Sequence, residues 1–342
     1  MSKKICYING RYLTKAVSGG VKRFSVELVK RLEKSEDYEF VVLCPKDAEI
    51  PENSNIKYKK IGLFKGNLWE QLSLCRYKLF HKGYLINLAN AMPIYSKKNI
   101  IVIHDVRLKE ELNKGITSKT HKKMDMIFKK AVKGKTIILT DSNFSKNRII
   151  ELYNCNPDKI HVLRLGYEHC IIKNQEYDSK FDELLNKEYY LTVNSISEHK
   201  NTKFIYELAK LHKDKLFYVI GKKFDEFGDD IPSNLIMLGR LSDYEMSLFY
   251  KKAKAFISPS LYEGFGLTPL EALYYGCKSV YLSDIEVFKE LFSSVATYFD
   301  PYNPNAFKFE EIIIDEENRN KILSNYNWDN CALDLINVLK NN

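Results

Sequence analysis

The sequence predicts an α/β protein built from two doubly wound domains, each a parallel sheet buried between helices. Three observations support this prediction. The chain has 342 residues, which is more than a single hydrophobic core usually organises. Short apolar runs rich in β-branched residues alternate with longer helix-periodic stretches, and the rhythm occurs in two series. A polar, strand-poor stretch near 165–187 separates the two series.

The ten apolar runs are the predicted strands. They are almost wholly apolar, as strands buried on both faces of a parallel sheet require. The first series is KICYI, EFVVLC, YLINL, NIIVIH and TIILT, and the second is YYLTVN, LFYVIG, NLIML, AFIS and KSVYL. We therefore predict an N-terminal domain over 1–166 and a C-terminal domain over 167–322. The last residues, 323–342, have the spacing of an amphipathic helix that returns to the first domain.

Charge and composition narrow the classes of partner and compartment. Residues 1–166 carry 33 Lys and Arg against 16 Asp and Glu, whereas the remainder carries 20 against 28. The basic half is therefore suited to anionic surfaces or substrates. The start of the chain lacks a signal-peptide pattern, and no apolar run reaches the roughly 18 residues of a membrane span. Seven scattered cysteines without C-x-x-C pairs are typical of reduced thiols, so we expect a cytoplasmic protein.

The stretch EGFGLTPLEAL predicts a helix start that binds an anion. Pro269 suits the first helical position and Thr268 is a good N-cap residue. The free N–H groups and the positive end of the helix dipole form a natural phosphate site. Gly264 and Gly266 let the backbone approach a ligand closely.

Two glutamates flank this helix start. Glu263 precedes the turn and Glu271 lies just inside the helix, so both carboxylates are placed to accept hydrogen bonds from sugar hydroxyls. A phosphate between two hydroxyl-bearing rings describes a nucleotide diphosphate-sugar. Two alternatives remain open at this point: Thr268 and Glu271 also form a capping-box pattern, and Glu263 also fits a solvated loop.

The segment 239–301 resembles the retaining nucleotide-sugar glycosyltransferases of family four, whose signature is a glutamate pair at the spacing of Glu263 and Glu271. The likeness extends through SGGVKRFSVEL, IVIHDV, TDSNFSKNRIIELYNCNPDKIHVLRLG and SEHKNTKFIYEL. The resemblance implies a GT-B fold, in which two Rossmann-like domains with parallel sheets face a central cleft. It also implies transfer of a hexose-type sugar with retention of configuration, to a hydroxyl of a glycan or lipid-linked glycan.

The resemblance also implies roles for residues of the second half. Glu271 would bind the donor ribose, and Glu263 would contact the transferred sugar. Lys200 would neutralise the diphosphate as the leaving group departs. Backbone N–H groups would contribute from Phe265, Gly266 and Leu267.

A second phosphate contact is less clearly marked. Asn194 and His199 stand where many relatives carry arginines, so Lys222 and Arg240 are substitutes for that contact. Arg240 alternatively lines the base pocket, where Leu241 would pack on the nucleobase.

In the first half, His104 and Asp105 follow the run NIIVIH, and ligands collect beyond the carboxyl ends of strands in open α/β sheets. The resemblance makes His104 the residue that touches the donor sugar, with Asp105 and Arg107 shaping the acceptor side. The loop at Gly19 and Gly20 would let the backbone meet the diphosphate or acceptor. A hydrogen-bonded loop histidine with Asp105 as a turn residue is the alternative.

Residues 114–135 carry eight lysines against one aspartate, with Met124, Met126, Ile127 and Phe128 interleaved. The stretch 62–72 adds Leu63, Phe64, Leu68 and Trp69 beside Lys65. A solvated basic face is the default interpretation. Basic and aromatic residues together also suit docking on an anionic membrane leaflet, and hence a lipid-linked acceptor at the inner face of the membrane. No nucleic-acid-binding motif is present.

These observations predict a metal-independent glycosyltransferase with no cofactor, in which Glu263, His104 and Lys200 are the catalytic residues. No D-x-D sequence occurs that would clamp a metal. The competing hypotheses are a sugar-nucleotide epimerase on the same scaffold and a non-catalytic subunit that binds nucleotide sugar. A nicotinamide dehydrogenase is disfavoured because no G-x-G-x-x-G follows any predicted strand.

Overall fold

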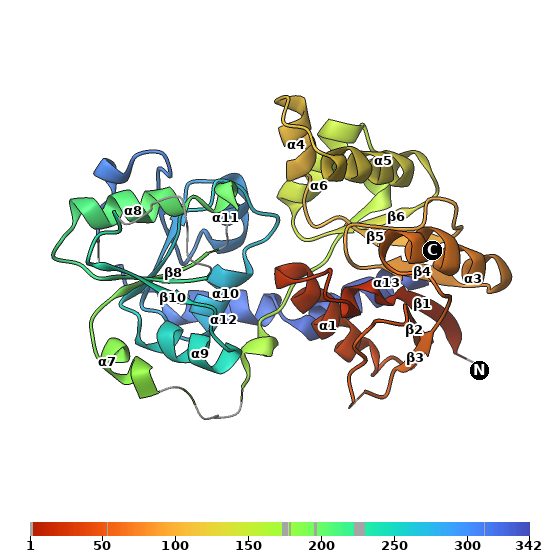
Figure 1. Ribbon diagram of the computed structural model, residues 1–342, viewed down its shortest axis with the longest axis horizontal. Coiled ribbons are helices and arrows are strands. Elements are labelled where there is room, and N and C mark those ends of the chain that lie inside the picture. The colour runs from red at the N-terminus through yellow and green to blue at the C-terminus, as the bar shows by residue number, and fades with distance from the viewer. Residues whose placement is uncertain are drawn as a thin grey trace. The chain divides into compact units, whose positions relative to one another are not determined.

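The protein is described by a computed structural model that covers residues 3–52, 54–172, 177, 179–194, 197–221, 230–310 and 312–342. Internal contacts divide the chain into two compact units (Figure 1). The first unit combines residues 1–165 with 328–342, and the second comprises residues 166–327. The second boundary, predicted after residue 322, lies after residue 327.

The first unit contains a seven-stranded sheet in the order β3-β2-β1-β4-β5-β6-β7, with every pair parallel. In the register, Ile8 of β1 faces Val42 of β2 and Ile86 of β4. Helices α1 and α5 lie on opposite faces of this sheet (Figure 1). The strands are β1 Lys4–Asn9, β2 Tyr38–Cys44, β3 Lys57–Lys60, β4 Tyr84–Asn87, β5 Asn99–Val102, β6 Ile137–Thr140 and β7 Ile160–Val162. The helices are α1 Gly19–Leu32, α2 Gly66–Leu68, α3 Cys75–Phe80, α4 Arg107–Asn113, α5 Lys119–Lys133 and α6 Asn143–Tyr153, with a π-helical turn at Trp69–Leu74.

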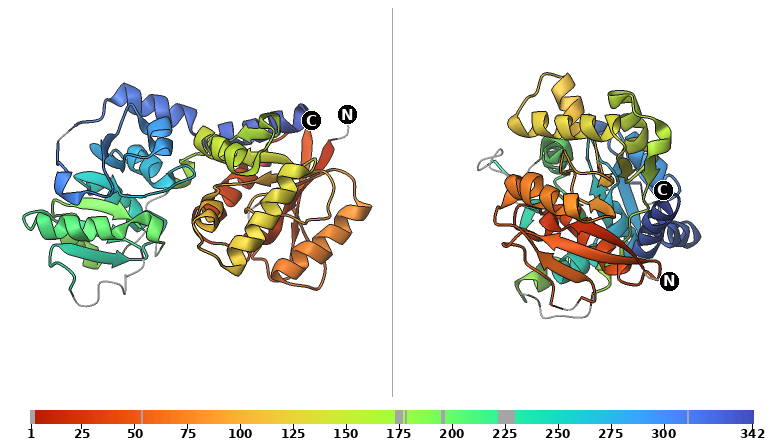
Figure 2. Two further views of the ribbon diagram at one scale, coloured as in Figure 1. Left: turned by 90° about the horizontal axis from the view of Figure 1, so that it is seen from above. Right: turned by 90° about the vertical axis from the view of Figure 1, so that its right-hand side faces the viewer.

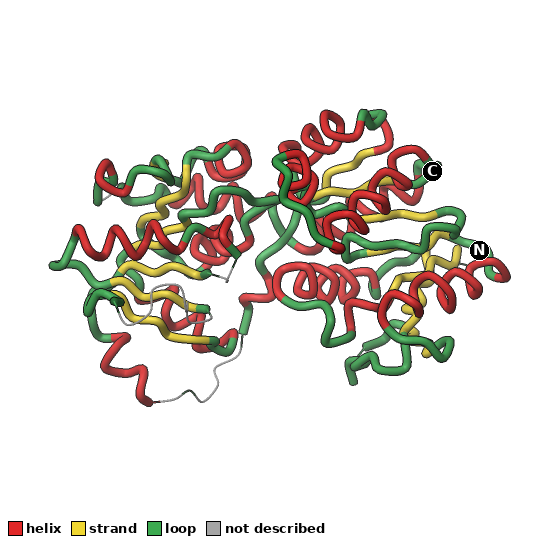
Figure 3. The backbone as a smooth tube through the Cα atoms, turned by 45° about the horizontal axis from the view of Figure 1, so that its top comes forward, coloured by secondary structure: helices red, strands yellow, loops and turns green. Residues whose placement is uncertain are grey.

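The second unit contains a six-stranded parallel sheet in the order β10-β9-β8-β11-β12-β13. Helices α8 and α9 cover opposite faces of this sheet (Figure 1), and strands and helices alternate along the chain (Figure 3). The strands are β8 Tyr190–Val193, β9 Phe217–Ile220, β10 Leu235–Gly239, β11 Ala255–Ser258, β12 Ser279–Ser283 and β13 Thr297–Phe299. The helices are α7 Asp182–Leu185, α8 Thr202–Leu211, α9 Asp243–Lys252, α10 Leu267–Tyr274, α11 Glu286–Phe292 and α12 Glu316–Asn325.

The end of the chain forms α13 (Trp328–Lys340), which packs on α1 within the first unit (Figure 2). Trp328 is fully buried, and its ring lies 6.0 Å from that of Phe24 on α1. Arg164 donates two side-chain hydrogen bonds to Asp334, at 2.9 and 2.6 Å. The apolar face of α13 is therefore part of the core of the first unit.

The predicted fold class of two Rossmann-like domains with parallel sheets is confirmed, and all ten predicted strands are present. Three further strands, β3, β7 and β13, were not predicted, and each lies at the edge of its sheet. Among the described residues, no helix is long and apolar enough to cross a membrane.

Candidate active site

The helix start in the second unit differs by two residues from its prediction. Helix α10 begins at Leu267, so Gly266 is the N-cap, and the prediction of Thr268 there is wrong. Gly266 has a φ of 118°, and a Cβ at this position would lie 2.9 Å from the ring of Phe288. Pro269 becomes the third residue of the helix, where its N–H would still lack an intrahelical partner. The first turn therefore still presents free N–H groups to an anion.

Lys200 contacts Glu263, which lies four residues before the first residue of this helix. The Lys200 ammonium donates to Glu263 Oε1 at 2.6 Å, and the Ser260 hydroxyl donates to the same oxygen at 2.7 Å. The Glu263 side chain is only 14% exposed, so the alternative of a solvated loop glutamate is wrong. Lys200 lies in the segment after β8, and Glu263 lies in the segment after β11. Neighbouring parallel strands end at the same edge of a sheet, so both segments lie at that edge.

Glu271 is held from two sides by residues that the sequence analysis did not identify. Its two carboxylate oxygens contact His169 Nε2 and the Tyr250 hydroxyl, each at 2.9 Å. Burial, together with the adjacent Glu271 carboxylate, raises the pKa of Tyr250 well above its ordinary value, so the phenol stays protonated and donates. The α10 N-terminus has no side-chain cap, and the capping-box alternative is wrong.

The segment that carries His169 is fixed against α10 by aromatic residues. The rings of Tyr167 and Tyr274 lie 4.8 Å apart, and the Tyr275 hydroxyl donates to the Cys170 carbonyl at 2.9 Å. Ligand atoms of His169, Cys170 and Glu271 all lie within 4.8 Å of one another, which is a spacing that could hold a metal ion. The His169–Glu271 hydrogen bond and the Tyr275 contact already account for this proximity.

The other predicted donor residues follow strands of the same sheet. Asn194 is buried after β8, and its amide donates to the Thr202 hydroxyl. After β9, Gly221 has a φ of 143°, and a Cβ there would lie 2.3 Å from the Asn194 carbonyl oxygen. After β10, Arg240 is exposed and Leu241 is half-buried. Polar side chains therefore follow β8 and β10 at this edge of the sheet, and a glycine follows β9 between them.

Three further predicted donor residues are Phe265, Leu267 and Lys222. The Phe265 side chain is buried with its ring 5.4 Å from that of Tyr326, so only its backbone is placed for a ligand. Leu267, half-buried, is the first residue of α10. Lys222 lies outside the described residues.

In the first unit, His104 follows β5 with its ring buried and both nitrogens engaged. Nδ1 lies 2.7 Å from Asp141 Oδ2, and Nε2 lies 3.0 Å from the Leu88 carbonyl oxygen. Burial lowers the pKa of His104, but the Asp141 carboxylate outweighs it, so the net pKa is raised above the ordinary value. The ring therefore has the geometry of the alternative, a hydrogen-bonded histidine.

The predicted acceptor-side residues lie at or next to the starts of helices α4 and α1 of this unit. Asp105 accepts a hydrogen bond from the Arg107 N–H at 3.0 Å, which is a turn contact at the start of α4, and burial raises the pKa of Asp105. The Arg107 guanidinium pairs with Glu111. Gly19 and Gly20 are exposed at the start of α1, where Gly19 has a φ of 66°.

A cavity of about 410 Å³ lies at the carboxyl end of β1, lined by Asn9, Arg11 and Glu70. Glu70 is 1% exposed and accepts hydrogen bonds from Asn9 at 2.8 Å and from Arg11 at 3.0 Å. It projects from the π-helical turn Trp69–Leu74, and such turns occur frequently at functional sites. Sequence analysis missed this group, whose one visible signal was the polar Asn9 at the end of an apolar run.

Comparisons with known proteins agree with this architecture. Residues 173–327 match the family described as Glycosyl transferases group 1. The chain is 23% identical to O-antigen chain mannosyltransferase B of Escherichia coli, over 94% of this chain and 96% of that protein. It is 29% identical to O-antigen chain mannosyltransferase RfbU of Salmonella typhimurium, over 60% of this chain and 59% of that protein.

Solved structures give the same fold. Sucrose-phosphate synthase from Thermosynechococcus elongatus matches with a TM-score of 0.74 and 12% identity, over 99% of each chain. Anabaena Alr3699/HepE in complex with UDP and glucose matches with a TM-score of 0.70 and 13% identity, over 99% of this chain and 100% of that one. The chain thus has the GT-B fold, and its likeness to the glycosyl transferases group 1 over residues 173–327 and to the mannosyltransferases supports a glycosyltransferase.

Proposed function

We propose that this protein transfers a hexose, with mannose the first candidate, from a nucleotide diphosphate-sugar to a hydroxyl of a glycan or lipid-linked glycan, with retention of configuration. The observation that carries the proposal is the contact of Lys200 with Glu263, which lies four residues before the first residue of α10. Mannose and a cell-surface polysaccharide are supported by the relatives, which are named as O-antigen mannosyltransferases.

The second unit would bind the donor by exchanging its internal contacts for contacts with the ligand. Without a ligand, Lys200 and Glu263 neutralise each other. A bound diphosphate would take the ammonium and the N–H groups of α10, which stabilise negative charge on the leaving oxygens. The Glu263 carboxylate would then accept hydrogen bonds from hydroxyls of the transferred sugar, and Glu271 would accept hydrogen bonds from those of the ribose.

The first unit would supply the acceptor site. The carboxylate of Glu70 and the amide of Asn9 line the 410 Å³ cavity, and such groups bind sugar hydroxyls. Gly19, Gly20, Asp105 and Arg107 remain the predicted acceptor-side residues. In the retaining reaction, the leaving phosphate would take the proton of the acceptor hydroxyl on the face where the new bond forms, so no separate base is needed.

Removing the groups that hold Glu271 is expected to weaken donor binding more than turnover. His169→Ala and Tyr250→Phe each delete one hydrogen bond to a carboxylate, so the KM for the donor should rise about tenfold. Steady-state kinetics over a range of donor concentrations measure this. His169→Gln, which keeps an N–H donor, should restore most of the affinity. An unchanged KM with a reduced kcat in His169→Ala would contradict the positioning role.

Divalent cations are expected to be dispensable. Lys200 and the N–H groups of α10 supply the positive charge that a metal provides elsewhere, so transfer in excess EDTA should stay within about twofold of the untreated rate. The measurement is initial transfer rate with EDTA and after adding back Mg²⁺, Mn²⁺ or Zn²⁺. Loss with EDTA and recovery with one of these ions would show a metal requirement, with His169, Cys170 and Glu271 as the first ligands to test.

Membrane contact is proposed through a corrected set of residues. The structure buries Trp69, Ile127 and Phe128, so the prediction that they face a membrane is wrong. Exposed leucines and phenylalanines instead gather around α2 and α3, and between Lys57 and Lys82 the single carboxylate, Glu70, is buried. The exposed apolar residues of this patch are Leu63, Phe64, Leu68, Leu72, Leu79 and Phe80.

Flotation with liposomes tests the patch. The chain is expected to float with anionic liposomes at low salt and to stay behind with neutral ones, because exposed apolar side chains insert while lysines attract anionic lipids. The Leu68→Glu, Leu72→Glu double variant should lose flotation. Leu333→Glu, an equally exposed leucine on α13, is the control. Unchanged flotation of the double variant would remove the patch from the account.

A transfer assay discriminates the candidate functions. The purified chain is incubated with UDP-, GDP-, TDP- and ADP-linked sugars, including GDP-mannose, and a lipid-linked or oligosaccharide acceptor. The proposal expects one donor to yield nucleoside diphosphate and an elongated acceptor. An epimerised donor without acceptor elongation would favour the epimerase, and tight donor binding with no turnover would favour a non-catalytic subunit.

A further inference from the structure

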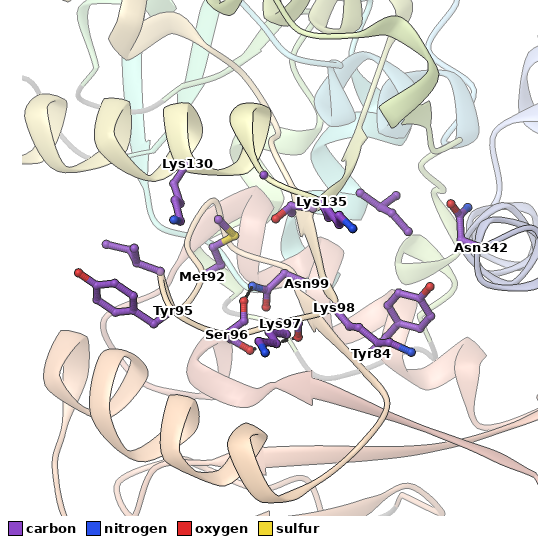
Figure 4. Close-up of a pocket in the computed structure, with 14 residues that line it drawn as sticks. Tyr84, Met92, Tyr95, Ser96, Lys97, Lys98, Asn99, Lys130, Lys135 and Asn342 are labelled. Carbon is purple, nitrogen blue, oxygen red and sulfur yellow. Dashed lines mark hydrogen bonds between the residues drawn. The ribbon is translucent and has the colours of Figure 1, made fainter.

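A second cavity lies in the first unit, at the opposite edge of the sheet from His104 and Glu70. It has a volume of about 740 Å³ and is lined by Tyr84, Asn99 and Ile137 (Figure 4). These are the first residues of β4, β5 and β6, so the cavity opens at the amino ends of the strands. Nothing in the proposed transfer reaction uses this edge.

Among the described residues, the charged side chains that line this cavity are all lysines. Lys97, Lys98, Lys130 and Lys135 contribute to its wall, and all four are exposed. Within the described residues, none of the four pairs with a carboxylate, whereas Lys129 on the same helix as Lys130 pairs with an aspartate at 2.7 Å. Four uncompensated ammonium groups around one concave site favour an anionic ligand.

Asn99 adds a buried hydrogen-bond acceptor. The residue is 3% exposed, and its Nδ2 donates to the Ser96 carbonyl at 2.8 Å, which fixes the orientation of the amide. Its Oδ1 is buried and has no hydrogen-bond partner among the described residues. Because an unpaired buried acceptor costs free energy, the site favours a ligand that brings an O–H donor. Figure 4 shows Asn99 near the centre of the lining residues, between Met92 and Lys98.

The walls of the cavity are held in place by other contacts. Gln71 donates to the Met92 carbonyl and accepts from the Ile94 N–H, each at 3.0 Å, which pins the loop before Lys97. The Lys159 ammonium donates to carbonyls at the end of α5. Its positive charge offsets the repulsion that these carbonyl oxygens would exert on a nearby anion. They belong to Ala131, Val132 and Gly134. Tyr84, Met92 and Ile94 give the site apolar surface as well.

We propose that this cavity binds an acidic saccharide, whose phosphate or carboxylate meets the lysines and whose hydroxyl donates to Asn99 Oδ1. A sugar ring supplies both requirements in one compact ligand, and the apolar residues pack against its carbon-bound hydrogens. The proposal does not depend on the donor chemistry of the second unit.

Calorimetric titration of the full chain tests this. Glucose 6-phosphate and glucuronate are the probes, and glucose and inorganic phosphate are the comparisons. We expect at least one acidic sugar to bind about tenfold or more tightly than both comparisons, and comparing the two probes identifies the preferred anionic group. The Lys98→Gln, Lys135→Gln variant should bind about tenfold more weakly, with an unchanged circular dichroism spectrum.

Two controls separate this cavity from other sites. Lys122→Gln, Lys133→Gln removes two exposed charges from α5 outside the cavity and should leave affinity unchanged. Lys200→Ala should also leave it unchanged, which excludes binding at the donor site. Equal loss in the α5 control, or inorganic phosphate binding as tightly as both acidic sugars, would overturn the proposal. Binding of anionic vesicles, and not of the acidic sugars, would also overturn the proposal, because this result would assign the lysines to a lipid surface.

Discussion

Lys200→Ala and Glu263→Gln are each expected to lower the rate of sugar transfer by roughly 100- to 1000-fold while the protein stays folded. The alanine variant loses the ammonium that stabilises the departing diphosphate. The glutamine variant keeps the size of the side chain but loses the charge that holds the sugar and orients Lys200 at 2.6 Å. Single-turnover rates at saturating donor and thermal unfolding curves are the two measurements.

A second ion pair in the same unit gives a matched control. Lys254 and Glu188 lie 2.8 Å apart, and Glu188 is 71% exposed. Lys254→Ala and Glu188→Gln should transfer sugar at the rate of the unsubstituted chain, because this pair lies outside the proposed site. Normal turnover in Lys200→Ala or Glu263→Gln would refute the role assigned to that residue.

Asp141→Ala is expected to destabilise the protein by roughly 3 to 5 kcal/mol near pH 6, because it leaves the buried His104 without its carboxylate partner. The raised pKa of His104 makes the contribution of the pair depend on pH. It is fully present below the ordinary histidine pKa and is lost as the pH rises through the raised value. Burial also raises the pKa of the neighbouring Asp105.

Asp141→Asn isolates this effect. The asparagine amide can still donate to a neutral His104 ring, so only the stabilisation of the imidazolium is removed. The difference in free energy of unfolding between this variant and the unsubstituted chain should be largest near pH 6 and should shrink toward pH 9. Urea denaturation at several pH values measures it. A difference that grows with pH would contradict the assignment of a buried imidazolium.

The central strands were predictable from sequence, and three edge strands were not, for a physical reason. A strand buried on both faces must be apolar throughout, and that pattern marks every central strand of both sheets. An edge strand is more exposed to solvent and need not be apolar throughout. The sequence of β3 is KYKK, with one residue half-buried and three exposed, and β7 and β13 have only three residues each. None of the three has the apolar pattern of a central strand.

The candidate site was predictable where its residues fall within a local motif. The glycine-bearing turn and the helix after it placed Glu263 and Glu271, and the resemblance added Lys200. The partners that orient these groups are remote in sequence: His169 lies 102 residues from Glu271, and Asp141 lies 37 residues from His104. His169 also falls in the polar stretch that predicted no element. Such pairings depend on tertiary contacts, which single-sequence periodicity does not encode.

The most direct test of the account is a calorimetric titration that compares a nucleoside diphosphate-sugar with the matching nucleoside monophosphate. In the proposed donor site, Lys200 contacts the diphosphate and Glu271 contacts the ribose. Lys200→Ala should therefore weaken binding of the diphosphate-sugar about tenfold or more while leaving the monophosphate little changed, and Glu271→Ala should weaken both. If both ligands bind Lys200→Ala as tightly as the unsubstituted chain, the proposed donor site is wrong.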